Sequence, residues 1–104
     1  MTVSKFVEIL LTCCKATYHL EADKEPNEFI VWSEVGERGF HADNIRSEET
    51  TLLAVDFLTK NEFSEVPEKI KQAFKEYEIS YKGPEIIFNK DTKRIQYAYT
   101  VEVV

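Results

Sequence analysis

Residues 50–59 form the segment that most constrains the fold of this 104-residue chain. The run is rich in β-branched and aromatic side chains, which favours a β-strand. Alternate residues of a strand point to opposite faces, and here both faces are largely apolar, which predicts a central strand covered on both sides. Helices would cover one side, and in so short a chain another subunit would cover the other. The two faces carry Leu53, Val55 and Phe57 on one side and Leu52, Ala54, Asp56 and Leu58 on the other.

Two segments show the three- and four-residue spacing of amphipathic helices. The first is expected at residues 3–15, where Thr2 can cap the helix start through its hydroxyl oxygen. The second is expected at residues 65–78, with Pro67 in the first turn, where its missing N–H costs nothing. Both helices therefore have one apolar face to bury.

The other apolar runs alternate or are β-rich, and they predict further strands near residues 16–20, 29–34, 85–88 and 94–103. The order α-β-β-β-α-β-β predicts an α+β fold in a single domain, residues 1–104. We expect a mostly antiparallel sheet of four or five strands with both helices on one face. The side chains expected in the core are Phe6, Leu10, Val55, Phe57, Ile70, Phe74, Tyr97 and Tyr99.

The net charge of −6 comes from one stretch, residues 21–49, while the rest of the chain is balanced. The stretch includes a long connection at residues 35–49 with two glycines, and long loops in compact domains are often functional. Two interpretations are open: a solvated loop, or a surface that repels polyanions or meets a basic partner. The acidic balance argues against a nucleic-acid groove, and no apolar run approaches the roughly 20 residues of a membrane span.

Residues suited to catalysis or metal binding are few. His41 and Asp43 are close in sequence, and Asp56 lies among apolar neighbours, so an acid–base or metal site is conceivable at these positions. The simpler interpretation gives Asp43 a turn hydrogen bond and Asp56 a strand-edge or interface position paired with a lysine. The adjacent Cys13 and Cys14 lack the spacing of a zinc or redox site. We therefore expect no enzyme activity, no cofactor and no metal.

Several short motifs occur in a characteristic order along nearly the whole chain. They are Tyr18-His19, Phe29 to Glu34, Ala42-Asp43-Asn44, Val55-Asp56-Phe57-Leu58-Thr59-Lys60, the helix at 66–77, Glu85 to Phe88 with Asp91-Thr92, and Tyr97 with Tyr99. This ordered set resembles the small tail terminator or tail-completion proteins of long-tailed bacteriophages and prophages. One departure is the turn after the second helix, where family members often carry a glycine and this chain has Tyr77-Glu78-Ile79-Ser80.

The resemblance implies a non-enzymatic structural protein that caps the tail tube and joins tail to head, often as a hexameric ring. It implies assembly in the bacterial cytoplasm, a place at the head–tail junction of the virion, and contacts with tail-tube and connector proteins. DNA would pass through without specific binding. A ring fits a strand that is apolar on both faces, and we expect the subunit contact at Trp32, Phe40, Leu52 and Leu58, although a core position is the other interpretation of Trp32. We also expect an acidic channel-facing loop with Glu34, Glu37 and Asp43.

Two alternatives remain open from the sequence. One is a monomeric α+β binding module, which sedimentation would reveal as a monomer at every concentration. The other is a small enzyme that uses His41, Asp43 or Asp56.

Overall fold

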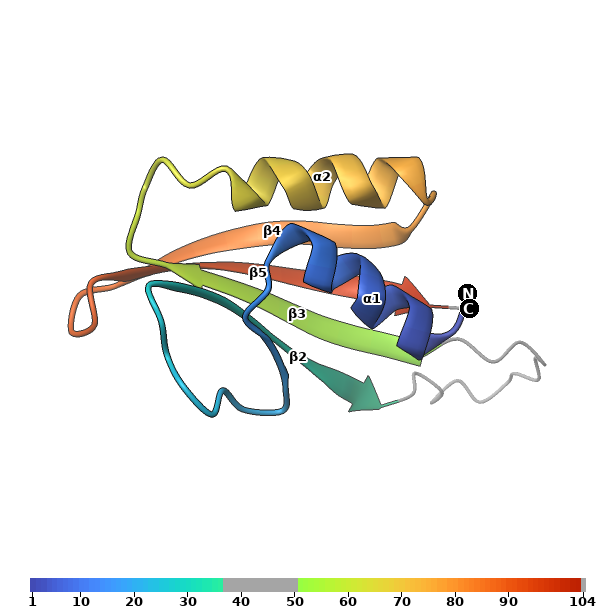
Figure 1. Ribbon diagram of the computed structural model, residues 1–104, viewed down its shortest axis with the longest axis horizontal. Helices are drawn as coiled ribbons and strands as arrows, with labels where there is room; N and C mark the ends of the chain where they lie inside the picture. Colours follow the sequence, from blue (N-terminus) through green and yellow to red (C-terminus); the bar gives the residue numbers. More distant parts are fainter. Residues whose placement is uncertain (37–50, 104) are drawn as a thin grey trace.

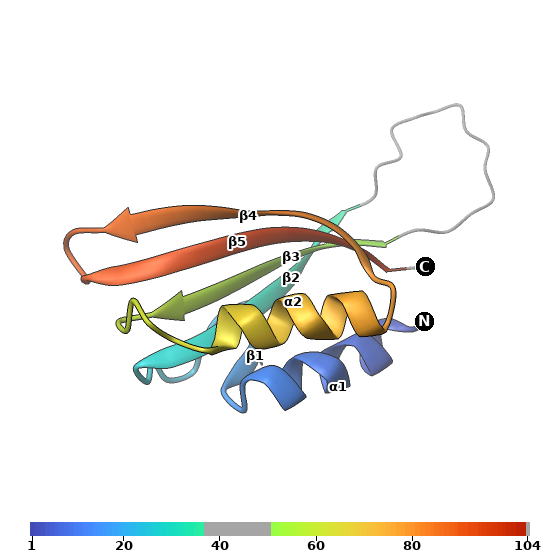
Figure 2. The same cartoon turned by 90° about the horizontal axis from the view of Figure 1, so that it is seen from above.

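The computed structural model describes residues 1–36 and 51–103, and their arrangement is an α+β sandwich of two layers (Figure 1). Five strands form one mixed sheet in the order β1-β2-β3-β5-β4, and all neighbouring strands are antiparallel except β1 and β2. Both helices lie on one face of this sheet (Figures 1 and 2). The elements are α1 (Val3–Cys13), β1 (Thr17–His19), β2 (Glu28–Gly36), β3 (Thr51–Thr59), α2 (Val66–Glu76), β4 (Ser80–Asn89) and β5 (Arg94–Val103).

The predicted fold class and element order are confirmed, and β3 is the central strand. Both helices are shorter than expected. The Thr2 hydroxyl accepts a hydrogen bond from the Lys5 amide at 3.0 Å and caps α1, as predicted. The helix ends at Cys13 because Cys14 adopts an extended backbone that leads into β1.

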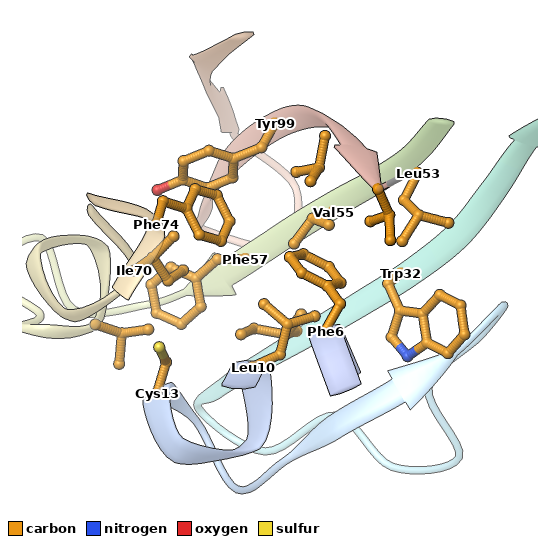
Figure 3. Packing of buried hydrophobic residues seen from close by; sticks show 14 residues of the cluster. Phe6, Leu10, Cys13, Trp32, Leu53, Val55, Phe57, Ile70, Phe74 and Tyr99 are labelled. Carbon is orange, nitrogen blue, oxygen red and sulfur yellow. The ribbon is translucent and has the colours of Figure 1, made fainter. Parts of the chain in front are cut away.

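The core lies between the helices and one face of the sheet (Figure 3). Alternation along β3 turns Leu53, Val55, Phe57 and Thr59 toward the helices, and all four are buried. Of the eight predicted core residues, seven are buried, and Tyr97 is half-buried against the cluster. Aromatic rings form its centre: Phe74 of α2 contacts the rings of Phe6, Tyr81 and Tyr99.

The last hairpin is longer than the sequence pattern indicates. The predicted strand starts at residue 85, whereas β4 starts at Ser80 and includes the Gly83-Pro84 pair. Gly83 has a φ of +104°, and the pairing with β5 shifts register between Lys82 and Glu85. A Cβ atom at Gly83 would lie 2.7 Å from the Ala98 carbonyl oxygen, so only glycine fits this irregularity. Proline is tolerated here because β4 is at the edge of the sheet.

The parallel pairing of β1 and β2 differs from what the sequence pattern indicates. Parallel neighbours need a crossover connection, and here residues 20–27 supply one without a helix. This connection passes on the side of the sheet opposite the helices (Figure 1). It therefore covers part of a face that is otherwise without a second layer among the described residues.

Candidate functional site

The candidate site is the face of the sheet that the helices leave uncovered, which we call the bare face. On its central strand β3, the side chains of Leu52, Ala54, Asp56 and Leu58 point away from the helices and are half-buried. Strand pairing places Val31 and Ser33 of β2 on one side of them, and Gln96, Ala98 and Thr100 of β5 on the other. These neighbouring side chains on β2 and β5 are all uncharged, and the carboxylate of Asp56 lies between them.

One end of the bare face is closed by the 20–27 connection. The Arg94 guanidinium, which is buried, holds the connection by donating to three backbone carbonyl oxygens: to Pro26 at 3.0 Å, Asn27 at 3.3 Å and Glu25 at 3.2 Å. The same group stacks over the ring of Phe29, 5.0 Å from its centroid. Phe29 is buried beneath these groups, and Tyr18 meets it edge-on. The bare face therefore starts beyond this cluster and extends along β3.

Asp56 lies in the middle of β3, at the centre of the bare face. Partial burial raises the pKa of its carboxyl group, and a hydrogen bond with the Gln96 side chain opposes that shift. Gln96, not a lysine, is therefore its partner in the structure. No group of three or more His, Cys, Asp or Glu side chains within residues 1–36 and 51–103 is placed to hold a metal ion. His41 and Asp43, the other residues of the enzyme alternative, lie outside the described residues.

Replacing Asp56 with asparagine should stabilise the protein at pH 7 by up to about 1 kcal/mol, since the half-exposed site moderates the penalty of burying a charge. A carboxyl pKa that is raised on folding means that the native state binds the proton more tightly than the unfolded chain. The penalty is therefore full above the folded pKa and disappears as the pH falls through it. The stability difference between the two proteins, measured by urea unfolding, should shrink from pH 7 toward pH 4. A difference that does not change with pH would contradict this.

The four residues predicted at the subunit contact fall in different places. Leu52 and Leu58 lie on the bare face, as the prediction assumed. Trp32 does not, and its assignment away from the helices is wrong: it pairs with Val55 and is buried in the core, its other interpretation from the sequence (Figure 3). Its ring stacks on the ring of His19, with 3.9 Å between the centroids. The run Phe29-Ile30-Val31-Trp32 is apolar at every position, so alternation alone leaves its face undetermined. Phe40 lies outside the described residues.

Of the three predicted channel-facing acids, only Glu34 is described. It lies near the end of β2 on the same side of the strand as Trp32, and its carboxylate is 2.9 Å from Nε2 of His19. That hydrogen bond lowers the pKa of Glu34. Both side chains are exposed, so the pair is a solvent-facing contact near the C-terminal end of β2. Glu37 and Asp43 lie outside the described residues.

A shallow groove of about 620 Å³ runs between the two helices on the other side of the molecule. Its walls include Glu68 and Glu76 of α2, Glu65 immediately before that helix, and Cys13 of α1. Burial raises the pKa of both Cys13 and Cys14, which disfavours the reactive thiolate form. This supports the structural interpretation of the cysteines.

Sequence reasoning missed two features that the structure makes prominent. The alternation of the last strand places Arg94 on its outer face, yet Arg94 binds a loop almost 70 residues away. The pattern at Ile86, Ile87 and Phe88 indicates a strand but not that all three are exposed at the sheet edge. The proline at position 84 was the available signal, because proline within a strand indicates an edge.

The chain matches no family model, no curated protein and no solved structure. No helix within the described parts of the chain is long and apolar enough to cross a membrane.

Proposed function

We propose that this protein is a non-enzymatic structural protein of a long-tailed phage or prophage, which caps the tail tube and joins tail to head as a ring. The α+β architecture is compatible with this role, and the motifs behind the resemblance fall on regular elements of the fold. Tyr18-His19 is in β1, Phe29 to Glu34 in β2, Val55 to Thr59 in β3, residues 66–76 in α2, Glu85 to Phe88 in β4, and Tyr97 and Tyr99 in β5.

The observation that carries the proposal is the bare face. Leu52 and Leu58 stand at the two ends of the central strand, on a surface that no helix of the described chain covers (Figure 2). Burying one leucine fully contributes about 1.5–3 kcal/mol, so covering this face with another subunit would be favourable. In a ring, one patch of each subunit meets a different patch of the next, and the bare face would supply one of the two.

The partners would be copies of this chain, the tail-tube protein and the head–tail connector. Assembly would take place in the bacterial cytoplasm, and the finished ring would remain in the virion. DNA would pass through the opening without specific binding, in keeping with a net charge of −6. Retention of the unmodified protein on duplex DNA in a gel-shift assay would contradict this part.

The test is to replace Leu58 with glutamate and measure assembly. Rings of the family often need the tail tip as a template, so assembly is measured both by sedimentation of the purified protein and by its capture on isolated tail tubes. A buried carboxylate in the contact should abolish assembly in both formats. The circular-dichroism spectrum should be unchanged, because the side chain is only half-buried in one subunit.

Two further variants keep the result interpretable. Leu52→Lys probes the other end of the strand, and it faces Glu102 across the sheet, so it adds no like-charge pair. Leu11→Glu changes an exposed leucine of α1, on the other side of the sheet from the bare face, and should assemble normally. Unfolding of both bare-face variants would place these leucines in the core, and normal assembly of both would overturn the proposal. A parent protein that stays monomeric and does not bind tail tubes would favour the alternative function, a monomeric α+β binding module.

A further inference from the structure

Strand β4 forms one edge of the sheet. Among the described residues it pairs with β5 alone, so the backbone N–H and C=O groups on its other side have no strand partner. It is ten residues long, and nine of those residues are exposed. Figure 2 shows β4 as the outer border of the sheet, with its far end extending past both helices.

The two halves of β4 differ in how well they are protected from pairing with another chain. Natural edge strands are blunted by proline, by lysine and by bulges. The first half has all three: Lys82, Pro84 and the register shift next to Gly83. The second half, residues 85–89, has a single charge at Glu85 and pairs regularly with β5. Any added strand would therefore pair with the second half.

The second half is also strongly apolar. Ile86 is 61% exposed, Ile87 43% and Phe88 57%, and the three are consecutive. Pairing with Tyr97 and Ile95 places Ile86 and Phe88 on the face that carries the helices, while Ile87 lies on the bare face opposite Gln96. Apolar surface is thus exposed on both sides of the edge, which is the signature of a strand that is completed by another strand.

We propose that residues 85–89 of β4 pair with the same residues of a second copy, antiparallel and around a two-fold axis perpendicular to the sheet. The two five-stranded sheets would then join into one continuous sheet. Such a contact is isologous: each residue meets a residue of the same patch in the other copy.

The geometry of a two-fold axis limits the possible registers. Residues that face each other across an antiparallel pair point to the same side of the sheet. A two-fold axis perpendicular to the sheet must therefore lie midway between the two copies of one residue, so that this residue faces its own copy. With the axis at Ile87, Ile86 faces Phe88 of the other copy and Glu85 faces Asn89. With the axis at Phe88, Ile86 would face the charged Lys90, and with the axis at Ile86, Ile87 would face Glu85. Only the register centred on Ile87 matches apolar groups with apolar groups.

The contact is small, since five residues pair on each side. Interfaces below about 1,200 Å² in total are characteristic of transient complexes, so we expect a dissociation constant of about 10–100 µM. The contact closes on itself and does not build a ring. It is therefore separate from the contact proposed for the bare face and does not depend on that function.

The first test is the replacement Ile87→Lys. In the proposed register the two introduced lysines oppose each other at the axis, which should weaken dimerisation at least about tenfold in sedimentation equilibrium. The matched control is Leu11→Lys, on α1, because Leu11 has the same 43% exposure in the monomer and should dimerise as the parent does. The proposal would be overturned if the parent stayed monomeric at protein concentrations up to about ten times the expected dissociation constant. It would also be overturned if the Ile87→Lys variant dimerised as the parent does. A monomeric parent would leave this edge open to a strand from a different protein.

The second test addresses the register. Ile86→Lys and Phe88→Glu should each weaken the dimer at least about tenfold, since each places a charge against an apolar side chain of the other copy. The double variant should dimerise again, because the introduced lysine of each copy then faces the introduced glutamate of the other, and its affinity should fall as salt is raised. A double variant no better than the single variants would overturn the register, and a dimer unaffected by any of these changes would place the contact elsewhere.

Discussion

Replacing Phe74 with alanine should lower the free energy of unfolding by about 3–5 kcal/mol, the usual cost of removing a buried phenylalanine. Phe74 is almost completely buried and is the aromatic contact between α2 and the sheet, with ring centroids 4.8 Å from Tyr81, 5.8 Å from Tyr99 and 5.9 Å from Phe6. The cavity left behind would separate these three rings. Since small domains have a total stability of about 5–15 kcal/mol, the loss is large and is measurable by urea unfolding.

Phe63→Ala is the control for this change. Phe63 precedes α2 and is 82% exposed, so its truncation should alter stability by no more than about 0.5 kcal/mol. A cost below about 1 kcal/mol for Phe74→Ala would mean that α2 does not pack on the sheet as described.

Replacing Arg94 with alanine should cost about 2–4 kcal/mol, because it leaves three backbone carbonyl groups without their charged donor and uncovers the ring of Phe29. Arg94→Lys should recover less than half of this loss. A lysine ammonium keeps the charge but not the planar fork that reaches Glu25, Pro26 and Asn27 together.

Limited trypsin digestion separates a local effect from a global one. Without the guanidinium, the 20–27 connection should detach, and cleavage after Lys24 should become faster than global unfolding allows. Lys90→Ala, in the exposed turn of the β4–β5 hairpin, should leave both the free energy of unfolding and the rate of cleavage after Lys24 unchanged. If Arg94→Ala matched the parent in both measurements, the connection would have to be held by other contacts.

The bare face and the edge of β4 make different predictions for assembly. Charge at Leu58 should affect contacts made through the bare face, whereas charge at Ile86 or Phe88, which point to the opposite face, should affect only edge pairing. Each proposal can therefore fail while the other stands. A protein with both contacts would combine a two-fold and a ring-forming interface in one particle.

The local periodicity of the sequence was enough to determine the order of the elements, their approximate bounds and most of the core. Side-chain direction repeats every 3.6 residues in a helix and every two in a strand, so an apolar face can be identified without knowing what covers it. This is why Phe6, Ile70, Phe57 and Tyr99 were correctly placed inside. The bare-face positions of Leu52 and Leu58 followed from the same alternation in β3.

Only the tertiary structure decided the features that depend on contacts between distant segments. The face of Trp32 follows from its pairing with Val55, because its own strand is apolar at successive positions. The parallel partner of β1, the edge position of β4 and the binding of Arg94 to residues 25–27 likewise follow from which strands lie side by side. The pattern along a chain specifies which way a side chain points. Which side chains it contacts depends on the hydrogen-bonded pairing of strands across the sheet, and that pairing is decided by the tertiary structure as a whole.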